Sequence, residues 1–120
     1  MFSLGDLESV AMDQLWSANG PLTVGEIHER LSSHRRCAYT RVMTALDNLY
    51  REGWTHRELV GGAYVYRPAL SRHEAAVRAL REVLRSSGDP ELTLLHFALS
   101  ASQQEAAILR DWLPGRGRRR

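Results

Sequence analysis

Apolar residues recur at helical spacing in two successive segments near the N-terminus. The first segment carries Leu7, Val10, Ala11, Leu15 and Trp16. Its pattern predicts a helix from Gly5 to Ala18, which the sequence Asn-Gly-Pro at 19–21 should end. In the second segment Thr23 and Glu26 have the spacing of a capping box, which predicts a helix from Thr23 to about Ser33.

A third helix is predicted over residues 38–53, AYTRVMTALDNLYREG, and its two faces differ in chemistry. At ~100° per residue one arc collects apolar side chains, namely Ala38, Val42, Ala45, Leu46 and Leu49. The opposite arc holds only polar ones, namely Thr40, Arg41, Thr44, Asp47, Asn48 and Arg51. An ordinary solvated face would carry acid–base pairs four residues apart. Thr, Asn and Arg can instead contact phosphates or base edges.

The period changes after Gly53. The segment WTHRELV, the pair Gly61-Gly62 and the segment AYVYRP predict two short strands joined by a two-residue turn, closed by Pro68. The predicted order is therefore helix, helix, helix, hairpin. This order is typical of a winged helix-turn-helix domain, placed here at residues 1–69, so the fold class is mainly α with a small β-hairpin.

Three further helices are predicted in the C-terminal part. Capping boxes open two of them, at Ser71–Glu74 and Ser102–Glu105, and Asp89-Pro90 opens the one between. Segments this short do not sustain a core alone. They either pack back on the N-terminal domain or pair with a second chain, and apolar surface on more than one side favours dimerisation by residues 70–113. The residues assigned to that interface are Leu80, Val83, Leu84, Leu92, Leu95, Phe97, Leu99, Leu109 and Trp112.

Length and composition limit the kinds of protein that this chain can be. A chain of 120 residues with 43% hydrophobic residues fits one domain, or one small domain with an appendage. The longest mostly apolar run, residues 92–99, is too short to span a bilayer, and the N-terminus does not have the pattern of a signal peptide. A cytoplasmic location is expected. The single cysteine, Cys37, excludes an intrachain disulfide.

Charge is segregated along the chain, although the net charge is only +2. Residues 1–29 contain five acids and no base, whereas residues 30–57 contain six arginines against Asp47 and Glu52. This distribution is typical of a protein that presents a basic face to an anionic partner. The basic tail, residues 114–120, is expected to be disordered, and it either adds nonspecific DNA affinity or acts as a solubilising extension.

These features predict a DNA-binding face on the third helix, flanked by arginines before the helix and on the hairpin arms. The residues assigned to DNA binding from this reasoning are Arg35, Arg36, Tyr39, Thr40, Arg41, Thr44, Asn48, Arg51, Arg57 and Arg67. Asp47 does not fit, because it would repel phosphate. It is expected to pair with Arg51 or to accept a hydrogen bond from a cytosine amino group.

Two other classes of protein are an enzyme and a protein-binding module. An enzyme would need a catalytic constellation, and the five histidines are scattered without a recognised catalytic motif. No enzyme activity, cofactor or metal site is therefore expected. The stronger rival is a winged-helix module that binds protein rather than DNA. That module should carry an apolar or acidic face on the third helix, which this chain does not.

Four segments together resemble the penicillinase-repressor (BlaI/MecI) family of bacterial regulators, over roughly residues 4–100. They are LGDLESVAMDQLW, LTVGEIHERL, AYTRVMTALDNLYREGW and GGAYVYRPALSRHE. The resemblance implies a winged helix followed by a helical dimerisation region, and a homodimeric repressor on a palindromic operator of antibiotic-resistance genes. It implies DNA contacts by Thr40, Arg41, Thr44 and Asn48, and backbone contacts by the wing around Gly61 and Gly62.

The resemblance also bears on induction. In the best-known members, a membrane sensor protease pathway leads to cleavage in the dimerisation region, often at an Asn-Phe bond. In this chain His96-Phe97 stands where that bond is expected. A related copper-responsive branch carries a C-terminal cysteine cluster, which is absent from this sequence.

Overall fold

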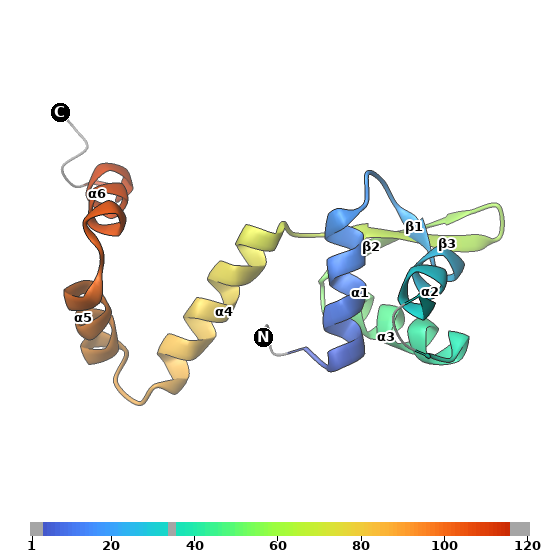
Figure 1. The fold of residues 1–120 in the computed structure, drawn as a ribbon, viewed down its shortest axis with the longest axis horizontal. Helices are drawn as coiled ribbons and strands as arrows, with labels where there is room; N and C mark the ends of the chain where they lie inside the picture. Colours follow the sequence, from blue (N-terminus) through green and yellow to red (C-terminus); the bar gives the residue numbers. More distant parts are fainter. Residues whose placement is uncertain (1–3, 34–35, 116–120) are drawn as a thin grey trace. The chain divides into compact units, whose positions relative to one another are not determined.

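The protein, seen in a computed structural model, forms two compact units, and the structure describes residues 4–33 and 36–115. The units divide between Ala79 and Leu80, within one helix. The first unit contains α1 (Asp6–Ser17), β1 (Leu22–Thr23), α2 (Val24–Ser32), α3 (Tyr39–Arg51), β2 (Thr55–Val60), β3 (Ala63–Pro68) and the start of α4 (Arg72–Ser86). The second contains the rest of α4, α5 (Pro90–Ser100) and α6 (Gln103–Trp112) (Figure 1).

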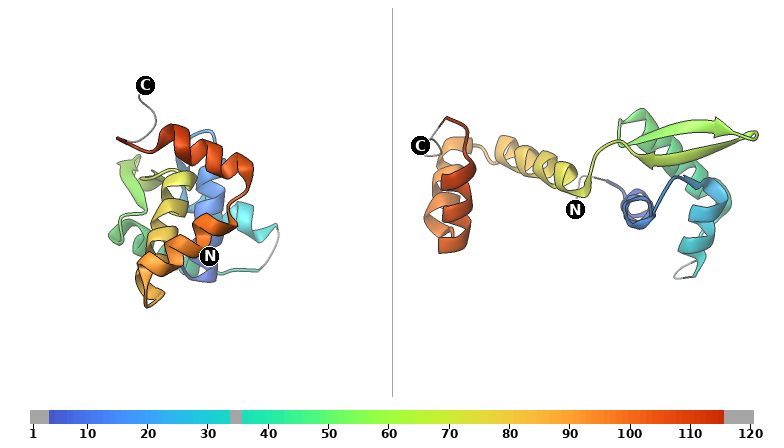
Figure 2. Two further views of the ribbon diagram at one scale, coloured as in Figure 1. Left: turned by 90° about the vertical axis from the view of Figure 1, so that its left-hand side faces the viewer. Right: turned by 90° about the horizontal axis from the view of Figure 1, so that it is seen from above.

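The sheet has the strand order β1-β3-β2, and all its pairs are antiparallel. Strands β2 and β3 form the predicted hairpin, with Val60 opposite Ala63. Gly61 and Gly62 have φ angles of 59° and 86°, the left-handed region that this type of two-residue turn requires. Figure 2 shows this hairpin extending beyond the helices of the first unit as a wing. Strand β1 was not predicted, because two residues are too few to display a period.

The core of the first unit gathers the apolar faces of α1, α2 and α3 against the sheet. Its buried members are Ala11, Met12, Leu15, Leu22, Val24, Ile27, Leu31, Val42, Leu46, Leu49, Trp54, Tyr66 and Ala75. The predicted apolar arc of α3 is buried at Val42, Ala45, Leu46 and Leu49. The expectation for Ala38 was wrong, since this residue is exposed. Ala38 is the N-cap, and its extended backbone (φ −69°, ψ 143°) lies outside the helical period.

Helix α3 ends in a Schellman motif, in which Gly53 supplies the left-handed residue. Its φ is 85°. The amide of Trp54 donates to the carbonyl of Leu49 (2.9 Å), and the amide of Gly53 donates to that of Tyr50 (3.1 Å). Trp54 and Leu49 are both buried in the core, so the chain leaves α3 in a fixed direction toward the wing.

The predicted capping box of α2 is present. The amide of Glu26 donates to Thr23 Oγ1 (3.1 Å), and the amide of Thr23 donates to Glu26 Oε1 (2.8 Å). Leu22 and Ile27, on either side of this box, are buried together and form the hydrophobic staple. The box therefore fixes where the chain turns from β1 into α2.

Replacing Thr23 with Ala is expected to lower the free energy of unfolding by about 1 kcal/mol, because the amide of Glu26 loses its acceptor. Urea denaturation followed by circular dichroism measures this loss. The matched variant Thr23→Ser keeps the hydroxyl, so its loss should be clearly smaller. Equal destabilisation by the two variants would assign the effect to the threonine methyl group rather than to the cap.

The first unit continues into α4. Ala75 is fully buried, and the indole of Trp16 donates from Nε1 to the carbonyl of Leu70 (3.0 Å). Arg72 pairs with Asp13 (3.1 Å) and lies over the Trp16 ring, 4.9 Å from its centroid. The sequence placed the domain boundary after residue 69. The compact unit extends to Ala79, and within it Leu70 and Arg72 contact α1.

The second unit has well-formed helix starts and no buried side chain in α5 or α6. Asp89 caps α5 through the amide of Leu92 (3.0 Å), and Ser102 caps α6 through the amide of Glu105 (3.1 Å). Among the residues that the structure describes, no helix combines the length and apolar character needed to cross a membrane.

Candidate nucleic-acid interface

The polar arc of α3 lies on the surface of the first unit. Thr40, Arg41, Thr44 and Arg51 are exposed, whereas Asp47 and Asn48 are half-buried. Since the opposite arc of the helix is in the core, packing fixes which face of α3 points outward. The arc thus forms a convex, hydrogen-bonding surface about three helical turns long.

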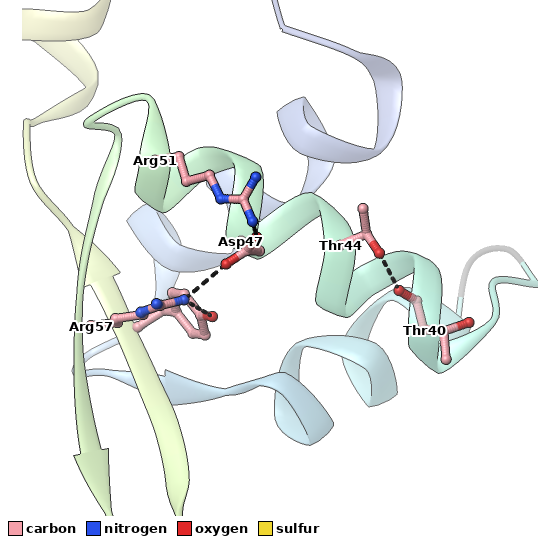
Figure 3. A network of polar contacts seen from close by, with 6 residues as sticks. Thr40, Thr44, Asp47, Arg51 and Arg57 are labelled. Atoms are coloured by element: carbon pink, nitrogen blue, oxygen red, sulfur yellow. Dashed lines mark hydrogen bonds and ion pairs between the residues drawn. The ribbon is translucent and has the colours of Figure 1, made fainter.

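Within this arc the hydroxyl of Thr44 is already engaged. Thr44 Oγ1 donates to the carbonyl of Thr40, one turn earlier, at 2.9 Å (Figure 3). The hydroxyl hydrogen is therefore satisfied inside the helix, and Thr44 offers an acceptor lone pair and a methyl group to a partner. A methyl group at this position suits contact with the methyl of thymine.

The N-terminus of α3 differs from the other helix starts. Of the six helices in the described parts of the chain, only α3 has no acidic residue in its first turn. No acid within α3 itself therefore compensates the positive end of its dipole, although Asp6 and Glu8 of α1 line the same groove as Thr40 and Arg41. An anion such as a DNA phosphate would be favoured there.

A groove runs along the other side of the arc, between α3 and the start of α1. It is lined by Gly5, Asp6, Leu7, Glu8, Thr40, Arg41, Thr44, Ala45 and Asn48. Two of the five acids from the acidic segment, Asp6 and Glu8, therefore line the same groove as Arg41, although the sequence suggested separate charged regions. Glu8 is held in place, because its Oε1 accepts from the amide of Gly5 (3.1 Å). The fold thus brings acids to one edge of the polar arc.

On the opposite edge, the wing meets α3 through Arg57 and Asp47. Arg57 Nη1 donates to Asp47 Oδ1 (3.0 Å) and to the hydroxyl of Tyr66 (3.5 Å). Asp47 also pairs through Oδ2 with Arg51 (2.8 Å) (Figure 3). The predicted pairing of Asp47 with Arg51 is confirmed. The second partner, Arg57, was not predicted, because nothing in the sequence gives the distance from the wing to α3.

The guanidinium of Arg57 is enclosed more than that of a surface arginine. Its carbon lies 4.0 Å from the centroid of the Tyr50 ring and 4.2 Å from that of Tyr64, and its side chain is 21% exposed. Hydrogen bonding to Tyr66 and Asp47 raises the pKa of Arg57 against the opposing effect of burial. The guanidinium of Arg57 therefore interacts with Asp47, Tyr66 and two tyrosine rings of the protein itself.

The remaining residues assigned to DNA binding are spread around this centre. Arg36 and Arg67 are exposed, and Tyr39 at the start of α3 packs edge-on against His28. Gly61 and Gly62 form the wing tip. Arg35 lies outside the described residues. Asp6 and Tyr64 were not predicted to belong to the site, because only the tertiary fold places Asp6 in the groove beside α3 and the Tyr64 ring against Arg57.

A hydrogen bond anchors the connection between α2 and α3. His28 Nε2 donates to the carbonyl of Cys37 (2.8 Å), and this bond ties α2 to the residue before the N-cap of α3. Within residues 4–33 and 36–115, no three His, Cys, Asp or Glu side chains cluster in a way that could hold a metal ion. His34 lies outside these ranges.

The second unit presents a large apolar surface. The residues assigned to the dimer interface that are strongly exposed are Leu80, Val83, Leu92, Leu95, Phe97, Leu99, Leu109 and Trp112; Leu84 is half-buried. Their exposed fractions run from 43% at Leu109 to 76% at Leu99. These side chains leave apolar surface exposed on α4, α5 and α6. His96 and Phe97 lie within α5, both exposed, and cleavage between them stays a prediction.

A unit of three helices and a β2–β3 wing, with a short β1 on the other edge of the sheet, is a winged helix. Together with the C-terminal helices it confirms the predicted fold class. The family model for the penicillinase repressor matches residues 4–114. The chain is also 37% identical over 110 residues to the protein named transcriptional regulator BlaI in two strains of Mycobacterium tuberculosis, covering 89% of this chain and 80% of the relative.

The chain therefore belongs to the penicillinase repressor family, and it is a transcriptional repressor of the BlaI type. These relatives are regulators and not enzymes, which confirms the prediction that this protein is not an enzyme.

Proposed function

We propose that the protein is a homodimeric repressor that binds a palindromic operator by placing α3 in the major groove. The observation that carries this proposal is the polar arc of α3, with Thr40, Arg41 and Thr44 exposed on the helix opposite its buried side. A major groove admits one α-helix, and residues near the helix N-terminus meet the base edges there. A cytoplasmic location follows from binding to bacterial DNA.

Each side chain of the arc has a role that suits its chemistry. Arg41 has no side-chain partner within the described residues and is suited to bidentate contact with guanine. Thr44 offers its methyl group and an acceptor, and Asn48 can pair with adenine. Arg36, Arg51 and Arg67 are exposed and suited to phosphates, as are the backbone amides at Gly61 and Gly62.

Dimerisation is proposed for the second unit, because apolar side chains on α4, α5 and α6 remain exposed in the single chain. A symmetric dimer buries the same patch on both copies and presents two α3 helices related by a two-fold axis. Such a pair matches two half-sites of a palindrome.

A mobility-shift titration at several salt concentrations tests DNA binding. We expect a duplex selected from a random pool to bind with an affinity that falls steeply with salt, with a slope of about −0.9 per phosphate contact in a double-logarithmic plot. The selected sequence should contain two inverted half-sites. Salt-independent binding, or a pool that yields no preferred sequence, would contradict the proposal.

The rival function is a winged-helix module that binds protein. A protein-binding α3 should present an apolar or acidic surface, whereas the exposed arc carries threonines and arginines, and the first turn of α3 contains no acidic residue of its own. These features favour an anionic, hydrogen-bonding partner.

A further inference from the structure

The contact between the wing and α3 is built around a single guanidinium. Arg57 comes from β2, its stacking partners Tyr50 and Tyr64 come from α3 and β3, and its carboxylate partner Asp47 comes from α3. Three elements therefore meet at one planar charged group (Figure 3).

We propose that Asp47 and Arg57 form a clamp that holds the wing at a fixed position against α3, and that neither side chain reads a base. This inference rests on the proposed function, in which α3 and the wing contact one DNA site together. Asp47 and Arg57 are positioning residues, since they act through the elements that they join.

The register of the hairpin places Arg57 beside Tyr64 and Tyr66 on the face of the sheet that meets α3. Arg57 pairs with Tyr66 across the hairpin, and Leu59 pairs with Tyr64. Tyr64 is thus the diagonal neighbour of Arg57 on the same face of the sheet, within reach of a long side chain. Because side chains alternate along a strand, Arg57 points to the α3 side of the sheet while His56 and Glu58 are exposed.

The surroundings of this side chain suit arginine better than lysine. A planar guanidinium can stack between two tyrosine rings and still donate in its own plane to Asp47 and Tyr66. A lysine ammonium keeps the charge, but it cannot stack on two rings and donate sideways in the same way. The clamp therefore depends on the shape of the group as well as on its charge.

Asp47 uses both carboxylate oxygens within the protein. Oδ1 accepts from Arg57 (3.0 Å) and Oδ2 pairs with Arg51 (2.8 Å). The acid thereby neutralises the enclosed arginine, and it orients Arg51, whose side chain is 72% exposed. The negative charge that would repel DNA is offset by two arginines, and Arg51 remains at the surface.

A wing that is already held against α3 loses less conformational entropy when DNA binds. A hairpin free to move against α3 would lose that freedom on binding, which weakens affinity without changing which bases are preferred. Loss of the clamp should therefore reduce affinity for every sequence by a similar factor.

The test measures operator affinity of the full-length protein for Asp47→Asn, Arg57→Lys and the double variant at one salt concentration. Each single variant is expected to bind about tenfold more weakly, and the double variant no more weakly than about tenfold, because both changes remove the same linkage. Glu29→Gln and Arg30→Lys, with the same kinds of charge change on exposed positions of α2, should stay within about twofold.

The change in operator affinity and base preference in the variants distinguishes the clamp from other roles of Asp47 and Arg57. If Asp47 were only a repulsive surface charge, its neutralisation would strengthen binding. If it read a cytosine, Asp47→Asn would change the preferred base at one position. If Arg57 contacted phosphate, Arg57→Lys would keep its affinity. Each of these results would overturn the clamp.

Amide hydrogen exchange without DNA separates this inference from the proposed function. Exchange in β2 and β3 is expected to be about tenfold faster in Asp47→Asn and Arg57→Lys, with α1 unchanged. A wild type that bound no duplex would contradict the proposed function, while faster exchange in the variants would still support the link between wing and α3. Unchanged exchange would overturn the clamp even if DNA binding were established.

Discussion

Ending the chain after Ala79 is expected to give a folded monomer that binds a palindromic operator at least about 100-fold more weakly than the full protein does. The physical reason is tethering, since a dimer converts binding of the second half-site into an intramolecular event. The truncated chain keeps the contacts of Leu70 and Arg72 with α1 and keeps Ala75 in the core, so the winged helix should remain intact. Sedimentation and mobility shifts with operator duplexes measure the two effects.

A duplex with a single half-site is the control for this truncation. If the winged helix is intact, the truncated and full-length proteins should bind one half-site with similar affinity. A second truncation after Pro68 should be less stable, because it removes the residues that pack on Trp16 and Asp13. A chain ending at Ala79 that still sedimented as a dimer would place the interface within the first unit.

Replacing Arg41 with Ala is expected to reduce the preference for operator over random DNA by about 10- to 100-fold, the effect of losing one bidentate base contact. Arg41 lies in the first turn of α3 and is exposed, beside a groove that also contains Asp6. Affinity for random DNA should change much less. Competition mobility shifts with operator and random duplexes at one salt concentration give the ratio directly.

Arg36→Ala is the matched comparison, because Arg36 is an exposed arginine just before α3. Loss of a phosphate contact should weaken operator and random DNA alike and reduce the salt slope by about one. If Arg41→Ala showed this uniform pattern, with its operator preference unchanged, Arg41 would belong to the backbone contacts rather than to the base contacts.

The winged helix could be predicted because its signals are local. Capping boxes, helical periodicity and the Gly-Gly turn each depend on residues a few positions apart, and the structure has all of them. Met12 is fully buried although it was not among the apolar residues used to predict α1. The helix was still predicted correctly, since its other apolar positions carry the same period.

The amino-acid sequence by itself determined the order of the helices and the hairpin, the polar arc of α3 and the family to which the chain belongs. Only the tertiary structure decided what Asp47 contacts, since Arg57 is ten residues away along the chain and reaches it through the register of the hairpin. The same holds for the acids beside Arg41 and for the end of the first unit within α4. Periodicity fixes which side of a helix is polar, whereas packing between elements fixes what that side faces.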